Sequence, residues 1–264
     1  MLRYKLGAAA AVMAIAGTAH VAAADDRAPA PRAVSAQGGL SITPGILEQT
    51  ARSGASGSVR IENTSGRRLR VRVRPRPWRQ ASSGTVAADR RRTLSRNVRV
   101  RSSRFILEPS AGRTVSVSLR RVPSRRSLYG SLETVGRPTK RRRGINVAYR
   151  LVSSLRFNPT ASARRLRLGA GGTRVSGRGR SRTLSLRVRN RGNTIDPVSG
   201  SVSITGSRGG RNTNIAAKAI LPGKRINLRL ASLAGMPRGS YRASVTLRQA
   251  NQNRVSVTRR FRIR

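Results

Sequence analysis

Residues 67–74 alternate arginine with apolar side chains. In an extended chain successive side chains point to opposite faces, so Leu69, Val71 and Val73 lie on one face while the arginines repeat about every 7 Å on the other. A regular row of guanidinium groups can donate charge-assisted hydrogen bonds to carboxylates or phosphates. The pattern predicts a half-buried strand with a cationic face that could bind a regularly charged polymer, and its candidate binding residues are Arg68, Arg70, Arg72 and Arg74. A soluble surface, or the amino-acid bias of a GC-rich genome, is the alternative explanation of this row.

Two clusters of consecutive basic residues are the other binding candidates. One lies in the polar stretch 79–97, which we expect to be a loop or an irregular crossing between sheets, and the other lies between two predicted strands. Loops allow side chains to reach a partner, although a solvated basic surface is the alternative interpretation of either cluster. The candidate residues are Arg90, Arg91, Arg92, Lys140, Arg141, Arg142 and Arg143.

The residues needed for common catalytic chemistry are scarce. The chain has no cysteine, and its one histidine, His20, lies in the predicted signal peptide. The eight acids are scattered, and only Asp25 and Asp26 are close in sequence. The glycines of 169–172 lack the pattern of a phosphate-binding loop, and we expect a loop or linker there. We therefore expect no enzymatic activity, no cofactor and no metal site.

The charge of the chain favours anionic partners. The formal charge is +48, and loss of Arg3 and Lys5 with residues 1–24 lowers it to +46. Such a charge attracts anionic polymers over long distances, and salt weakens the attraction. We expect an anionic cell-envelope polymer or an acidic surface protein as partner. Nucleic acid is disfavoured, because aromatic residues, which stack bases, make up only 3% of the chain.

The two-residue alternation recurs along most of the chain, at 115–119, 184–188, 226–230 and 245–247. This periodicity predicts an all-β protein. Residues 63–66 have the composition of a turn and predict a hairpin that leads into the arginine-bearing strand, which we expect to end at Trp78. About seven short strands separated by turns are typical of an immunoglobulin-like sandwich, and the pattern restarts after residue 165, which predicts two such sandwiches in tandem.

The domain boundaries follow from shifts in composition. Residues 1–24 have a basic start, an apolar stretch and small residues before the first acids, as in a secretory signal peptide, and 25–38 resemble a flexible leader. We assign 39–157 and 166–264 to the two sandwiches and 158–165 to a hinge. No other stretch approaches the ~20 apolar residues of a membrane span. The expected location is secreted, extracellular or periplasmic, in association with the cell envelope.

The order of these segments resembles a known family. A strand and turn at 59–66, a charged strand at 69–78 and an approach to an alternating strand at 105–119 are similar to the first domain of periplasmic pilus chaperones and of WxL-associated surface proteins. The second half, with Leu-Pro-Gly at 221–223 and Pro-Arg-Gly-Ser-Tyr at 237–241, resembles the second immunoglobulin-like domain of such surface proteins. The resemblance covers about 40–264.

The resemblance adds a second hypothesis of function. In pilus chaperones, a basic pair in the interdomain cleft anchors a subunit's C-terminal carboxylate, and an edge strand of alternating apolar residues completes the subunit's fold. The many arginines leave that pair unassigned, and the donor strand is expected near 98–107, where the alternation breaks at Ser102-Ser-Arg104. Our first hypothesis is a secreted, non-enzymatic binding or structural protein. The alternative is a pilus-assembly chaperone that binds a pilus subunit.

Overall fold

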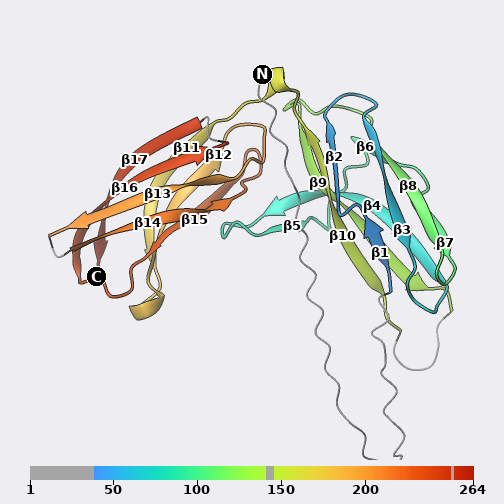
Figure 1. The fold of residues 1–264 in the computed structure, drawn as a ribbon, viewed down its shortest axis with the longest axis horizontal. Helices are drawn as coiled ribbons and strands as arrows, with labels where there is room; N and C mark the ends of the chain where they lie inside the picture. The colour runs from blue at the N-terminus through green and yellow to red at the C-terminus, as the bar shows by residue number, and fades with distance from the viewer. Residues whose placement is uncertain (1–38, 141–145, 208, 251–252) are drawn as a thin grey trace, which may run out of the picture. The chain divides into compact units, whose positions relative to one another are not determined.

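The computed structural model describes residues 39–140, 146–207, 209–250 and 253–264, which form two immunoglobulin-like β-sandwiches in series (Figure 1). The predicted signal peptide and leader, 1–24 and 25–38, lie outside the described residues. None of the helices in the described ranges has the length and apolar character that a membrane crossing requires.

The first sandwich pairs a four-stranded sheet, in the order β1-β3-β8-β6, with a six-stranded sheet, in the order β2-β10-β9-β4-β5 with β7 also paired to β4. Figure 1 shows β3 and β8 in one layer and β9 and β10 in the other. The strands are β1 (Ser41–Thr43), β2 (Ile46–Thr50), β3 (Ser56–Glu62), β4 (Leu69–Gln80), β5 (Val86–Ala88), β6 (Val98–Val100), β7 (Arg104–Leu107), β8 (Gly112–Leu119), β9 (Leu128–Pro138) and β10 (Tyr149–Asn158).

Alternation in the sequence decides which side chains form the core. Leu69, Val71 and Val73 of β4 are buried between the two sheets. Val59 and Ile61 of β3 cover them from the opposite layer. The arginine row of β4 therefore lies on the outer face of the six-stranded sheet, as the alternation predicts.

Two predictions around this strand are wrong. Residues 63–66 do not close a hairpin, because β3 pairs with β1 and β8, whereas β4 belongs to the other sheet. The turn thus carries the chain across the sandwich. The arginine-bearing strand also continues beyond Trp78 to Gln80 and pairs with β5, so part of the stretch 79–97 forms a β-hairpin.

The second sandwich packs the sheet β11-β12-β15 against the sheet β14-β13-β16-β17 around its own apolar core. Its elements are η1 (Ala161–Ala163), β11 (Leu168–Ser176), η2 (Gly179–Ser181), β12 (Thr183–Asn190), β13 (Val198–Gly206), β14 (Gly209–Lys218), β15 (Arg225–Ser232), β16 (Gly239–Gln249) and β17 (Asn253–Ile263). The glycine cluster 169–172 was expected to be a loop but lies within β11. A register shift between Ala170 and Thr173 marks a β-bulge there.

A buried asparagine recurs at equivalent points of the two sandwiches. Asn63 follows β3, and its Nδ2 donates to the backbone oxygens of Leu107 and Glu108 at 3.2 and 2.9 Å. Asn190 ends β12, and its Nδ2 donates to Ile220 O at 2.7 Å. Both accepting segments come just before a strand and contain proline, so the weak internal repetition in the sequence corresponds to a repeated tertiary contact.

Candidate functional site

The outer face of the six-stranded sheet carries most of the predicted arginine row. Arg70, Arg72 and Arg74 point outward from β4, and Arg76 continues the row by two residues. Arg68 differs from the others, because its Nε lies 2.7 Å from Glu108 Oε1 in an exposed ion pair. Sequence reasoning missed Arg76, although the same alternation persists through the prolines at positions 75 and 77.

Glu133 is the acid at the centre of this face. Its Oε2 lies 2.8 Å from Arg76 Nε, and its Oε1 contacts an NH2 group of Arg150 from β10. Arg76 also donates from NH1 to the backbone oxygen of Arg92, so the loop after β5 covers this end of the row. Two arginines thus neutralise one buried carboxylate and fix the loop over the strand.

The remaining arginines surround an open groove of about 910 Å³ on the same face. Arg137 of β9 and Arg90 of the loop join the β4 row along its wall. Desolvation lowers the pKa of Arg72 from its usual value, and so does repulsion from Arg74, Arg104 and Arg76. The arrangement can bind an anion through several guanidinium groups at once.

The two predicted basic clusters contribute unequally to this groove. Arg90, Arg91 and Arg92 are exposed, but only Arg90 of the three lines the groove. Lys140 is exposed, and its backbone oxygen accepts a hydrogen bond from Arg67. The rest of the second cluster, Arg141, Arg142 and Arg143, lies outside the described residues.

The edge of the sheet at β10 is the second feature of the site. β2 pairs with β10 only over Ser154 to Asn158. At the start of this ladder Ser154 N donates to Gly45 O at 2.8 Å, so the Ser154 N–H points to the β2 side of β10. Backbone direction alternates along a strand, so Arg150 and Val152 present their N–H groups to the same side. Within the described ranges no strand pairs with that side of 149–153.

Apolar side chains are exposed beside this open edge. Val147 and Val152 retain 49% and 50% of their exposure, and Ile46 of β2 retains 47%. The other large exposed apolar residues in the described chain, Val86 and Ile106, also belong to this six-stranded sheet. Val147, Val152 and Ile46, which lie beside the open edge, are the apolar residues that an interaction surface there would use.

The structure divides the segment in which a donor strand was predicted. The stretch 98–107 is divided between β6, which pairs with β8, and β7, which pairs with β4 in the other sheet. The break in alternation at Ser102-Ser-Arg104 falls at the turn 101–103 and the first residue of β7. An open edge lies instead on β10, which the sequence predicted only as one strand of the sandwich.

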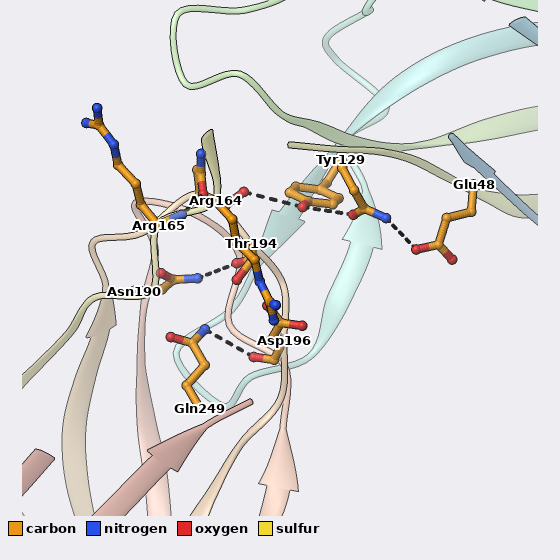
Figure 2. Close-up of polar contacts among 10 residues, drawn as sticks. Glu48, Tyr129, Arg164, Arg165, Asn190, Thr194, Asp196 and Gln249 are labelled. Carbon is orange, nitrogen blue, oxygen red and sulfur yellow. Dashed lines mark hydrogen bonds and ion pairs between the residues drawn. The ribbon is translucent and has the colours of Figure 1, made fainter. Parts of the chain in front are cut away.

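Polar contacts join β9 and β10 to the segment that precedes β13 (Figure 2). Tyr129 OH donates to Asn158 Oδ1 at 3.0 Å and lies 3.3 Å from the backbone oxygen of Asn193. Arg164 forms an ion pair with Asp196 at 3.0 Å, at the end of the predicted hinge 158–165. These contacts hold the start of the second sandwich against the end of β10.

Within the described residues, no three histidine, cysteine, aspartate or glutamate side chains come together as a metal site would require. The chemistry that the site does offer consists of open backbone hydrogen bonds, exposed apolar side chains and guanidinium groups, all of which bind partners.

The fold is similar to that of fimbrial chaperones. The class 5 fimbriae chaperone CfaA aligns with a TM-score of 0.50 and 13% identity over 83% of this chain and 98% of that chain. A chain from a chaperone and tip-adhesin complex of CFA/I fimbriae biogenesis has a TM-score of 0.49, 13% identity, and coverage of 84% and 99%. A chain of the CsuC–CsuE chaperone and tip-subunit complex of Acinetobacter baumannii has a TM-score of 0.46, 12% identity, and coverage of 84% and 98%.

The sequence comparisons add nothing to this likeness, because no protein-family model and no curated protein matches the chain. At 13% identity the likeness to CfaA shows a shared fold. The resemblance to pilus chaperones is thereby supported in its fold, whereas nothing supports the part that concerns WxL-associated proteins.

Proposed function

We propose that this protein is a chaperone-type binding protein that holds a β-rich, pilus-type subunit by adding its β10 edge to the subunit's sheet. The open backbone of Arg150 and Val152, flanked by exposed valines, is the observation that carries the proposal. Strand addition supplies affinity through main-chain hydrogen bonds and specificity through alternate side chains. The fold shared with CfaA supports this function.

The comparisons favour this hypothesis over the one we placed first from sequence. Association with an anionic envelope polymer rests on net charge, and none of the similar structures supports it. A chaperone of this type would act outside the cytoplasm, in agreement with the signal peptide predicted at 1–24. The two hypotheses also differ in their response to salt, because main-chain hydrogen bonds between paired strands are far less screened than exposed charges.

Site-specific crosslinking tests the proposal directly. A photo-crosslinking amino acid at Val152 in the full-length chain, expressed in its own organism, should capture one small β-rich protein, identified by mass spectrometry, and 1 M salt should not abolish the capture. Arg150→Pro, which removes one of the backbone donors of the open edge, should reduce the yield at Val152, whereas Arg150→Gln, which loses the ion pair with Glu133 but keeps the N–H, should not.

Two other positions make the result specific. Val86 on β5 is exposed and apolar but lies away from the β10 edge, so a crosslinker there should capture little of the same protein. Capture at Ile106 on β7 in place of Val152 would mean that the partner binds at β7 and not at the β10 edge. Loss of all capture at high salt would refute strand addition.

A further inference from the structure

The groove on the outer face of the six-stranded sheet holds more positive charge than the chain neutralises. Glu133 is the one acid that lines it, and Arg76 and Arg150 already pair with that carboxylate. Within the described residues, five other lining arginines have no ion-pair partner: Arg70, Arg72, Arg74, Arg90 and Arg137. An anion in the groove would therefore meet guanidinium groups whose donors are not engaged by carboxylates.

The arginines of the β4 row repel one another. Desolvation and then repulsion from Arg74, Arg104 and Arg76 lower the pKa of Arg72, so the neighbouring cations disfavour each other's charged form. The sheet fixes the backbone positions of these cations, so they cannot move far apart. A ligand with several negative charges would relieve this repulsion, whereas a single small anion would reach only one or two of them.

The spacing of the β4 row indicates the form of the ligand. Arg70, Arg72 and Arg74 repeat every second residue of a strand, about 7 Å apart. An extended peptide with acidic residues at every second position has the same repeat, so successive carboxylates can face successive guanidinium groups. Val135 and Val147 also line the groove. Arginine together with apolar side chains is typical of protein interfaces. A phosphate polymer has no apolar groups that could pack against the two valines.

We infer that this groove binds an extended acidic segment of a protein, with carboxylates at alternate positions, and that the segment belongs to the subunit held at the β10 edge. The class of partner rests on the proposed function. β9 and β10 separate the β4 row from the open edge, and Val147, just before β10, lines the groove and also lies beside the edge. Arg150 of β10 lies between the two surfaces and contacts the buried Glu133.

Two matched triple variants of the full-length chain test the inference. The groove variant carries Arg70→Gln, Arg72→Gln and Arg74→Gln. The control variant removes the same charge from exposed positions on one sheet of the second sandwich, and its substitutions are Arg187→Gln, Arg189→Gln and Arg229→Gln. Circular dichroism and thermal unfolding of both variants establish that they are folded. All six arginines lack a described ion-pair partner, so neither variant leaves a buried charge unpaired.

The probes are two fluorescent dodecapeptides, one that alternates Glu with Thr and one that has the same composition with its glutamates in a single block. Fluorescence anisotropy at 150 mM salt gives the dissociation constants. We expect the alternating peptide to bind several-fold more tightly than the block peptide. The groove variant should bind it about tenfold more weakly, and the control variant within about twofold of wild type.

Three results would overturn the inference. Equal weakening in both triple variants would mean that net charge alone attracts the peptide. Equal affinity for the two peptides would mean that the spacing of the carboxylates does not matter for binding. Displacement of the alternating peptide by inorganic polyphosphate, at a lower concentration of negative charge than unlabelled peptide requires, would assign the groove to a phosphate polymer. Failure of the proposed function is distinguishable, because Val152 crosslinking would then be lost while peptide binding to the groove persisted.

Discussion

Arg76 and Glu133 form a buried ion pair between β4 and β9, with Nε and Oε2 2.8 Å apart and side-chain exposures of only 10% and 8%. The arginines of this face fall into two groups. Arg76 and Arg150 are neutralised by Glu133, and the loop that contains Arg92 covers Arg76. Arg70, Arg72 and Arg74 line the open groove and have no ion-pair partner among the described residues. The single acid of the groove is therefore already paired, and the proposed binding of an acidic segment depends on the arginines that it does not reach.

Replacement of Glu133 by glutamine should destabilise the first sandwich. The variant keeps the shape of the side chain but leaves Arg76 buried without a countercharge, which costs about 3 kcal/mol in comparable buried pairs. Urea unfolding followed by circular dichroism measures the loss. Glu108→Gln is the matched control, because the Arg68–Glu108 pair is more than half exposed and should contribute at most about 1 kcal/mol. Equal losses in the two variants would contradict a special role for Glu133.

The buried asparagines should be equally costly to remove from either sandwich. Asn63→Ala removes the Nδ2 donor from the backbone oxygens of Leu107 and Glu108, although Glu108 O keeps its bond from Ala111 N, and Asn190→Ala removes the Nδ2 donor from Thr194 O and Ile220 O. Each substitution should lower the free energy of unfolding by about 2 to 4 kcal/mol, since buried acceptors lose their partners.

The control for these variants is an exposed asparagine of the same fold. Asn214 lies on the edge strand β14, and its substitution by alanine should change stability by about 0.5 kcal/mol or less. If Asn63→Ala or Asn190→Ala were as mild as Asn214→Ala, the repeated contact would not stabilise the sandwiches. Denaturant unfolding of the three variants under identical conditions provides the comparison.

Alternation in the sequence predicts which side of β4 is buried, because it needs no knowledge of distant contacts. The orientation of Arg70, Arg72 and Arg74 follows from that alternation alone. Which strands pair with each other does not follow from alternation. The turn after Asn63 has the composition of a hairpin, yet its asparagine bonds to residues more than forty positions away, and this contact directs the chain into the other sheet.

The candidate site illustrates the same limit. Arg137 and Arg150 come from strands far from β4 in sequence, and no local pattern shows that they share its outer face. The open edge of β10 depends on where β2 stops pairing, at Ser154, which is a property of the assembled sheet. The periodicity through Arg76 is the one missed signal that the sequence did contain.

Gln80 should couple the β4–β5 hairpin to the loop before β15. Its Nε2 donates to Ala219 O and its Oε1 accepts from Leu221 N, both at 2.9 Å. Gln80→Ala should expose the Leu221 amide and raise its hydrogen-exchange rate about tenfold, with a small effect on global stability. Gln80→Glu keeps the acceptor for Leu221 but loses the donor to Ala219, so its Leu221 amide should stay near wild-type protection.

An unrelated glutamine checks that the effect is local. Gln49 is exposed on β2, and Gln49→Ala should leave the Leu221 exchange rate unchanged. Fast exchange at Leu221 in wild type would mean that the hydrogen bond to Gln80 is not maintained in solution, and the same slow rate in wild type and Gln80→Ala would mean that other contacts protect this amide.

Tyr129 should make the stability depend on pH in the alkaline range. Desolvation, followed by the nearby Asp196 and Glu48, raises the pKa of its hydroxyl well above the usual 10.0. Below about pH 10 the hydroxyl is neutral in both folded and unfolded chains, so the stability that it contributes is fully present. Above that pH the unfolded chain releases the proton first, and stability should fall as the pH rises toward the folded-state pKa. Urea midpoints between pH 9 and 11 measure the decline.

Tyr129→Phe isolates this residue, because its unfolding midpoint should decline less over the same pH range even though the variant starts from a lower stability. The lower starting point reflects the lost hydrogen bonds to Asn158 and Asn193. Absorbance at 295 nm gives an independent reading: the folded wild-type and variant proteins should titrate alike up to about pH 11, since Tyr129 stays protonated. A difference of one tyrosinate between them near pH 10 would mean that solvent reaches the hydroxyl, and the contact between β9 and the segment before β13 would then be open in solution.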